Sequence, residues 1–166
     1  MAVTTSNLVR VGRLEEIDGC RVVSGGRHGI AVFVRDGRAY AVDNRCPHMG
    51  FPLQKGSVRD GILTCHWHHA RFDLASGGTF DPWADDVRTY DTVIEDGIVF
   101  VDPRPRPVDI AERWKTRLRD GLEQNLSLVI VKAVLALLEA GVPATDIVAI
   151  GARFSATYRG PAGLRE

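Results

Sequence analysis

The most constraining feature of this sequence is a pair of short loops that hold two of its three cysteines and four of its five histidines. The first loop is 45-RCPHMGFPLQKGSV-58 and the second is 64-TCHWHHARFDLASGG-78. Glycine and proline interrupt regular structure in both stretches, so the side chains are presented from an irregular backbone. Thiolate and imidazole are the ligands that zinc and iron–sulfur centres prefer. The sequence therefore predicts a metal centre built from both loops.

The spacing of these residues separates two kinds of metal centre. Cys46 and His48 are followed, after sixteen residues, by Cys65 and His68, so each loop supplies one thiolate and one imidazole. This partition suits a [2Fe-2S] cluster in which two histidines bind one iron and two cysteines bind the other. The alternative is a tetrahedral Cys2His2 zinc site. A zinc finger, however, holds its ligands on a short ββα unit or knuckle, and not in the β-rich frame predicted here.

Short β-prone segments between turns fill the chain from residue 8 to residue 101. Residues 30–34 and 39–42 flank an Asp-Gly pair, which is a signal for a tight hairpin. A second Asp-Gly pair, at Asp96 and Gly97, separates two further runs of this kind. Many short strands at close spacing predict an antiparallel β-sandwich or barrel.

The character of the chain changes after residue 102. Pro103, Pro105 and Pro107 stand at every second position, and they remove backbone donors and favour a stiff, extended conformation. We therefore predict a β-domain over residues 1–102 and a proline-rich linker over residues 103–108.

The remaining segment, residues 109–166, has the pattern of helices. Asp109 with Glu112 resembles a capping box that opens the first helix. A second helix is predicted over residues 126–140, where Gly141 and Pro143 end it, and a third from about residue 144 to residue 158. The expected fold class is mainly β, and α+β overall.

The two loops and their surroundings resemble the Rieske [2Fe-2S] family over roughly residues 8 to 102. Besides the four cysteines and histidines, the similarity includes Gly50, Pro52, Leu53, Gly56, Arg71, Phe72, Asp73, Gly77 and the closing hairpin at 96–101. The resemblance implies a Rieske-type antiparallel β-sandwich with a two-loop cluster-binding subdomain and one [2Fe-2S] cluster per chain. It also implies that Cys46 and Cys65 bind the inner iron, while His48 and His68 bind the outer iron near solvent.

Two departures from the Rieske proteins of the cytochrome bc complexes predict a low reduction potential. Those proteins carry an extra cysteine in each loop, joined as a disulfide, where this sequence has Phe51 and Trp67. They also have a serine and a tyrosine that donate to sulfur, where this sequence has Ala70 and Phe72. Such hydrogen bonds stabilise the more negative, reduced cluster. We therefore expect a potential near about −150 mV, at the low end of the Rieske range.

A comparison with the ring-hydroxylating oxygenases of the same family argues against one possible function. Their large subunits add a catalytic domain in which two histidines and a carboxylate hold a mononuclear iron. No histidine follows His69 in this sequence, so we do not expect the chain to be the oxygenase itself. We expect an electron carrier without its own catalytic site that exchanges single electrons with a reductase or an oxygenase. The alternatives are the Rieske module of a larger oxidoreductase assembly and a redox-responsive regulatory module.

The other histidines and the third cysteine are expected to be structural. His66 and His69 do not fit the ligand spacing, so we expect them to be loop residues that face solvent or pack. His28 follows two glycines, which indicates a turn. Cys20 is expected to be a small buried residue in a strand.

Charge and composition exclude several partners. Lys plus Arg equals Asp plus Glu at 21 each, so nothing attracts the whole chain to nucleic acid or anionic membranes. Asp81, Asp85 and Asp86 form an acidic cluster that we expect to be a solvated loop, with steering of a basic redox partner as the alternative. The sequence has no secretory pattern and no apolar run long enough to span a bilayer, so the cytoplasm is the expected location.

The predicted helix over residues 126–140 has aliphatic side chains on almost every side. They are Leu126, Leu128, Val129, Ile130, Val131, Val134, Leu135, Leu137 and Leu138. A helix that is apolar all round has to be buried all round. We therefore expect residues 109–158 to form a homo-oligomer or to dock on a partner, unless the chain is a piece of a longer protein.

Overall fold

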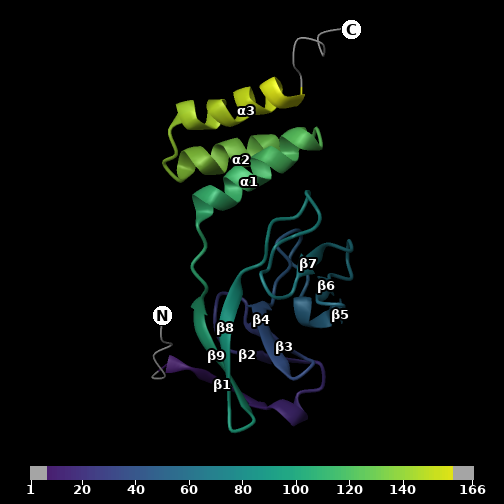
Figure 1. Cartoon of the computed structure of the whole chain (residues 1–166). Coiled ribbons are helices and arrows are strands. Elements are labelled where there is room, and N and C mark those ends of the chain that lie inside the picture. Colours follow the sequence, from purple (N-terminus) through teal and green to yellow (C-terminus); the bar gives the residue numbers. More distant parts are fainter. Residues whose placement is uncertain (1–6, 159–166) are drawn as a thin grey trace. The chain divides into compact units, whose positions relative to one another are not determined.

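The computed structural model describes residues 7–158, and the chain divides after Arg106 into two compact units (Figure 1). The described part of the first unit consists of strands and two short 3-10 turns, and that of the second consists of helices. The predicted fold class, mainly β and α+β overall, is confirmed.

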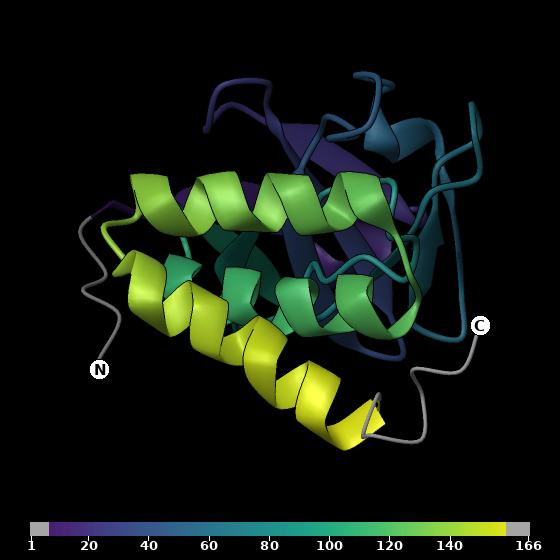
Figure 2. The ribbon, with the colours of Figure 1, turned by 90° about the horizontal axis from the view of Figure 1, so that it is seen from above.

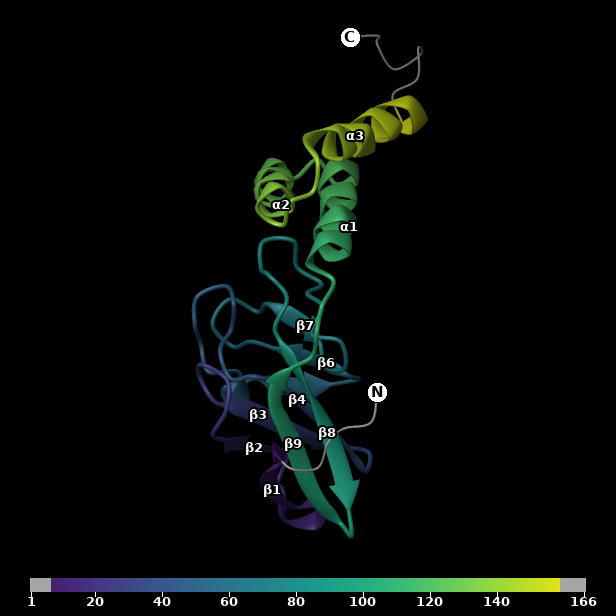
Figure 3. The same ribbon diagram turned by 90° about the vertical axis from the view of Figure 1, so that its left-hand side faces the viewer.

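Six strands of the first unit form one antiparallel sheet in the order β1-β9-β8-β4-β3-β2 (Figure 3). They are β1 Val9–Arg13, β2 Cys20–Val23, β3 Ile30–Arg35, β4 Arg38–Asp43, β8 Thr89–Glu95 and β9 Ile98–Pro105. A 3-10 turn, η2 Leu14–Glu16, follows β1. The guanidinium group of Arg21 in β2 donates to the carbonyl oxygen of Val11 in β1 at 3.2 Å. The two edge strands therefore approach each other, and the sheet curls toward a barrel.

The Asp-Gly pairs form the predicted hairpin turns. Asp36 and Gly37 join β3 to β4 with φ angles of 50° and 71°, and Asp96 and Gly97 join β8 to β9 with φ angles of 49° and 73°. Two consecutive residues at positive φ are typical of the type I′ turn, whose twist matches that of the flanking strands.

A second, three-stranded antiparallel sheet has the order β5-β6-β7. Its strands are β5 Ser57–Arg59, β6 Ile62–Thr64 and β7 Arg71–Asp73, and the 3-10 turn η3 Leu53–Lys55 precedes β5. A third Asp-Gly turn, at Asp60 and Gly61, joins β5 to β6. Both predicted metal-binding loops are connected to this small sheet.

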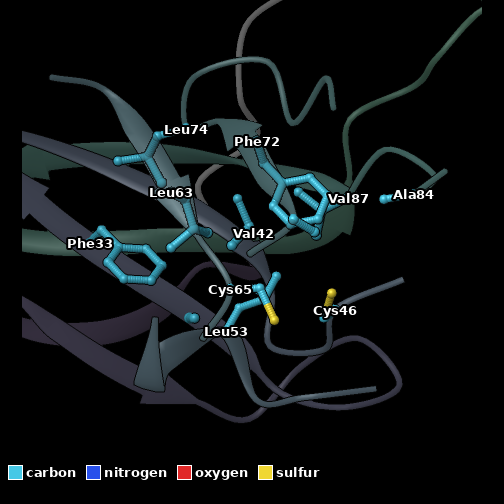
Figure 4. Packing of buried hydrophobic residues seen from close by; sticks show 12 residues of the cluster. Phe33, Val42, Cys46, Leu53, Leu63, Cys65, Phe72, Leu74, Ala84 and Val87 are labelled. Carbon is cyan, nitrogen blue, oxygen red and sulfur yellow. The ribbon is translucent and has the colours of Figure 1, made fainter. Parts of the chain in front are cut away.

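Strand β3 is buried on both faces and contacts two groups of buried side chains. Ile30 and Val32 belong to the group that fills the curled sheet. Ala31 and Phe33 belong to the group between that sheet and the small sheet, together with Cys46 and Cys65 (Figure 4). The alternation follows the two-residue period of a strand. The predicted metal-binding cysteines are therefore anchored in the hydrophobic core.

Strand β9 is longer than the sequence predicts. It continues to Pro105, so residues 103–105 of the predicted linker lie in the sheet. Within the described residues β1 begins at Val9, opposite Val101, whereas β8 continues to pair with β9 as far as Pro105. Proline is tolerated at an open sheet edge because no hydrogen-bond donor is required there.

The second unit contains three helices, α1 Ile110–Glu123, α2 Ser127–Glu139 and α3 Ala144–Tyr158 (Figure 2). The predicted cap is confirmed, because the carboxylate of Asp109 accepts a hydrogen bond from the N–H of Glu112 at 3.0 Å. Gly141, with φ of 77°, ends α2 in a Schellman motif, where the N–H of Val142 donates to the carbonyl oxygen of Leu137. None of the helices within residues 7–158 has the length and apolar content needed to cross a membrane.

Within the single chain the second helix is buried on one face only, in agreement with the expectation that the chain cannot cover all of its apolar side chains. Coverage of the other face by a second copy or a partner stays a prediction. Val129, Ala133 and Leu137 are buried, and they lie on one face at four-residue spacing. The opposite face is 47–64% exposed. Its residues are Leu128, Val131, Leu135 and Leu138, which we call the α2 stripe.

Candidate metal centre

The part of the first loop that carries Cys46 and His48 lies between β4 and η3 and is closed by two backbone hydrogen bonds. The N–H of Cys46 donates to the carbonyl oxygen of Phe51 at 2.8 Å, and the N–H of Gly50 donates to the carbonyl oxygen of Cys46 at 2.8 Å. Gly50 has φ of 87°, a conformation that side chains rarely adopt. The resulting tight turn fixes the positions of Cys46 and His48 relative to each other.

The second loop joins β6 to β7 and is closed in the same way. The N–H of Cys65 donates to the carbonyl oxygen of Ala70 at 2.8 Å. In both loops, therefore, the cysteine amide donates to the residue five positions later. His69, at φ of 60°, turns the chain just before Ala70 and β7.

The four predicted ligands form an inner pair and an outer pair. Cys46 and Cys65 are only 2% and 1% exposed, and Figure 4 shows them at the edge of the buried group. His48 is half-buried and His68 is exposed, and their imidazole rings meet edge to face with centroids 4.8 Å apart. The structure thus brings all four together with the cysteines inside and the histidines outside.

The environment of Cys46 affects both its pKa and its use as a ligand. Burial raises the pKa of its thiol, the backbone N–H of His48 partly offsets this by donating to the sulfur, and the hydrogen bond with the Cys65 thiol raises the pKa further. Metal ions bind the thiolate form, so binding releases protons. The backbone N–H of His48, and a smaller contribution from that of Met49, then stabilise negative charge on the sulfur.

The Nδ1 atom of His48 has the environment of a metal-binding nitrogen. It is buried and has no hydrogen-bond partner among the residues that the structure describes. Buried polar atoms are almost always paired, and leaving one unpaired costs about 1–3 kcal/mol. Coordination of a metal ion would satisfy this atom, so the residues present fit an iron-containing group.

A sequence model of the Rieske [2Fe-2S] domain matches residues 7–91, just over half of the chain. The chain belongs to the Rieske [2Fe-2S] family. It therefore carries one [2Fe-2S] cluster, and the resemblance noted in the sequence is confirmed.

The relatives of this Rieske domain include ferredoxin components and a much longer protein. The ferredoxin component of the p-cumate 2,3-dioxygenase system of Pseudomonas putida is 31% identical over 49% of this chain and 70% of its own length. Human apoptosis-inducing factor 3 is 33% identical over 52% of this chain, which spans only 15% of that protein. Among solved structures, the ferredoxin of carbazole 1,9a-dioxygenase from Nocardioides aromaticivorans IC177 matches with a TM-score of 0.56 and 26% identity. That match covers 60% of this chain and all of the ferredoxin.

The geometry of the Rieske domain suits a binuclear cluster better than a single zinc ion. A structural zinc ion takes four ligands at one point, whereas each iron of a Rieske cluster takes only two protein ligands. The inner and outer pairs match the second requirement.

Two tryptophans contact the histidines of the Rieske domain. The ring of Trp83 lies edge-on to His48 with centroids 4.7 Å apart, and that of Trp67 lies edge-on to His68 at 6.2 Å. Both tryptophans are exposed, by 39% and 56%. Trp67 belongs to the second loop and precedes His68 directly in the sequence, whereas only the fold reveals the contact of Trp83, 35 residues from His48.

The remaining candidates lie outside the inner and outer pairs. His66 and His69 are exposed in the second loop, and His28 is exposed in the turn before β3, as predicted. Cys20 is half-buried in β2, so the prediction of a buried residue is correct only in part. Burial raises the pKa of Cys20 to about 11, although Arg35 lowers it slightly. This thiol is therefore protonated at neutral pH.

Asp81 is buried, so the expectations of a solvated acidic loop and of partner steering are wrong for this residue. Its carboxylate accepts hydrogen bonds from the backbone N–H of Arg71 at 2.7 Å and from the guanidinium at 2.8 and 3.2 Å. Arg71 holds the pKa of Asp81 below its usual value, against the opposing effect of burial. Asp86 also has a partner, because it accepts a hydrogen bond from the N–H of Thr79. The ion pair with Arg71 anchors the segment that carries Trp83.

Proposed function

We propose that this protein is a low-potential Rieske electron carrier that passes single electrons from a reductase to an oxygenase. The observation that carries the proposal is the arrangement of an inner cysteine pair and an outer histidine pair. The cluster supplies a one-electron couple when it is bound. The exposed ring of His68 and the half-buried ring of His48 are the ligands nearest to an approaching protein.

The proposed ligands are Cys46 and Cys65 for the inner iron and His48 and His68 for the outer iron. Burial of the cysteines excludes water from the sulfur atoms, and the backbone N–H of His48 stabilises negative charge on the Cys46 sulfur. Nδ1 of His48 is the proposed binding atom of that imidazole, because it is buried and unpaired within the described residues.

The names of the relatives support the class of partner. The Pseudomonas relative is a ferredoxin component of a dioxygenase system, and the structural match is a ferredoxin of carbazole 1,9a-dioxygenase. By analogy, we propose a reductase and an oxygenase as the partners of this chain. We also propose that it acts in the cytoplasm.

The roles that we propose for the segments of the chain follow the predicted domains. The β-rich unit, which ends with β9 at Pro105, carries the cluster, the short segment after β9 connects, and residues 109–166 form a homo-oligomer or dock. The self-association of the helices is supported by the exposed α2 stripe.

Spectroscopy of the purified protein tests the proposal. Aerobically purified protein should be red-brown, with two irons and two labile sulfides per chain, and after dithionite reduction it should give a rhombic EPR signal with average g below the free-electron value. A reductase of an oxygenase system with NADH should then reduce it without a change of oligomeric state. Colourless protein with one bound zinc ion would contradict the cluster. A change of oligomeric state on reduction would favour a regulatory module.

A further inference from the structure

A hollow of about 210 Å³ lies beside the first loop and is lined mainly by charged side chains. The lining residues are Arg27, His28, Asp43, Arg45, Pro47, Asp86, Val87 and Arg88. The three arginines are exposed, whereas the two aspartates are half-buried. Arginine is always protonated in proteins. The hollow therefore presents positive charge to solvent.

Backbone hydrogen bonds hold together the three segments that contribute the arginines. The N–H of Asp43 donates to the carbonyl oxygen of Arg88 at 2.9 Å, and the N–H of Asn44 donates to the carbonyl oxygen of Gly29 at 3.0 Å. The carboxylate of Asp43 accepts a hydrogen bond from the hydroxyl of Tyr90, which is only 1% exposed. The arrangement thus has a fixed frame, with one aspartate bonded to a buried residue and three exposed arginines around it.

The hollow adjoins the proposed metal centre. Pro47 lines it and stands between Cys46 and His48 in the first loop. The formal net charge of the whole chain is zero, so electrostatic attraction of a partner has to come from a local patch. This patch is positive.

We propose that the arginine-lined hollow binds carboxylate groups on the surface of an acidic redox partner. The guanidinium group pairs with carboxylates through two parallel hydrogen bonds, so three arginines favour an Asp- or Glu-rich surface. Carboxylates bound there bring the partner close to His48. The inference rests on the proposed electron-transfer function and adds the sign of the partner's charge.

The test compares two small oxidants of opposite charge acting on the dithionite-reduced, full-length protein. Hexacyanoferrate(III), an anion, and tris(phenanthroline)cobalt(III), a cation, each take one electron from the reduced cluster and become the iron(II) and cobalt(II) complexes. The triple variant Arg27→Gln, Arg45→Gln and Arg88→Gln should react with hexacyanoferrate about tenfold more slowly than wild type at low salt. With the cobalt complex it should react as fast as wild type or faster. The differences should disappear at high salt.

A matched variant separates local from total charge. Arg13→Gln, Arg38→Gln and Arg59→Gln together remove the same charge from exposed positions outside the hollow. This control variant should slow the hexacyanoferrate reaction much less than the triple variant of the hollow does. Midpoint potentials are measured for all three proteins. Equal slowing by both variants would overturn the inference, because total charge would then explain the rate.

A decaglutamate peptide distinguishes a carboxylate-binding surface from a site for small anions. It should inhibit the hexacyanoferrate reaction of the wild type and have little effect on the triple variant. Failure of the peptide to compete would overturn the acidic-partner proposal. Protein without a reducible cluster would instead refute the electron-transfer function itself.

Discussion

The rings of Phe51 and Trp67 pack against each other, with centroids 5.2 Å apart and planes inclined by 46°. Phe51 belongs to the first predicted metal-binding loop and Trp67 to the second, so this contact joins the two loops. The resemblance described above implies that the Rieske proteins of the cytochrome bc complexes have a disulfide at these two positions. An aromatic pair contributes about 0.5–1.5 kcal/mol beyond its buried area, so here a non-covalent contact helps to hold the loops together.

Truncation of either ring should weaken retention of the cluster. We expect Trp67→Ala and Phe51→Ala each to lower the temperature at which visible colour is lost. The loss of unfolding free energy in the double variant should be about 1 kcal/mol smaller than the sum of the two single losses, because both single variants remove the same contact. Phe80→Ala, which removes an aromatic side chain that is 53% exposed, is the control. Strictly additive effects would show that the ring contact contributes nothing.

Neighbouring histidines in the second loop provide a test of the ligand assignment. His66 and His68 are both exposed, yet only His68 is a proposed ligand. His68→Ala should abolish the Rieske EPR signal and lower the bound iron, whereas His66→Ala should keep both, as measured on proteins purified side by side. Loss of the signal in His66→Ala with retention in His68→Ala would refute the assignment.

The potential should rise when hydroxyl groups are placed near the sulfur atoms. Ala70 and Phe72 are completely buried in the strand and loop that follow Cys65. Ala70→Ser with Phe72→Tyr should raise the midpoint potential, because O–H donors stabilise the added negative charge of the reduced cluster. Spectroelectrochemistry measures the shift, with Ala41→Ser, in the core of the curled sheet, as the control. An unchanged potential with an intact cluster would mean that these positions do not reach the sulfurs.

Removal of the Asp81 charge should destabilise the first unit. Asp81→Asn breaks its ion pair with half-exposed Arg71, and we expect a loss of about 1 kcal/mol in urea unfolding, with allowance for solvent screening. Asp60→Asn is the control, because Asp60 and its partner Arg59 are both almost fully exposed. Equal losses in the two variants would contradict a special role for Asp81.

The stability difference between wild type and Asp81→Asn should depend on pH, because the pKa of Asp81 is lowered in the folded protein. A carboxylate with a depressed folded-state pKa contributes stability above its unfolded-state pKa, and this is lost as pH falls through the folded-state value. The gap between wild type and Asp81→Asn should therefore stay constant between about pH 5 and pH 8 and shrink only below about pH 4. A gap that changes with pH in the neutral range would contradict this linkage.

The α2 stripe should support self-association of the chain. Leu128, Val131, Leu135 and Leu138 follow the three-four-three spacing of a coiled-coil seam. We expect the full chain to be a dimer at high concentration by light scattering, and Val131→Glu with Leu135→Glu to be monomeric with an unchanged cluster spectrum. Val148→Glu, at a valine on α3 that is 68% exposed, is the control. A wild-type chain that remains monomeric would contradict the proposed self-association.

Local signals were sufficient to predict the helices and the hairpins. The cap at Asp109 and the glycine at Gly141 act within a few residues, so the sequence alone locates the helix ends. The predicted start and end of the third helix agree with α3. Positive-φ Asp-Gly turns likewise require only two adjacent residues.

Features that depend on distant partners were not predictable. The extension of β9 to Pro105 depends on β8, and the burial of one face of α2 depends on packing against the other helices. The sequence indicated a surface charge at Asp81 because its partner, Arg71, is ten residues away at the start of β7. The arginines of the hollow come from three separate segments, so no spacing rule connects them.

The separate groups of buried residues in the two units have a thermodynamic consequence. Each group draws its side chains from one unit only, so each unit has its own cooperative interactions. A chain of this kind is not expected to unfold in a single two-state step. Bleaching of the cluster on heating would then report on the β-rich unit, and loss of the helical circular dichroism signal on the other. Two melting temperatures, each with its own enthalpy, would describe the protein in place of one.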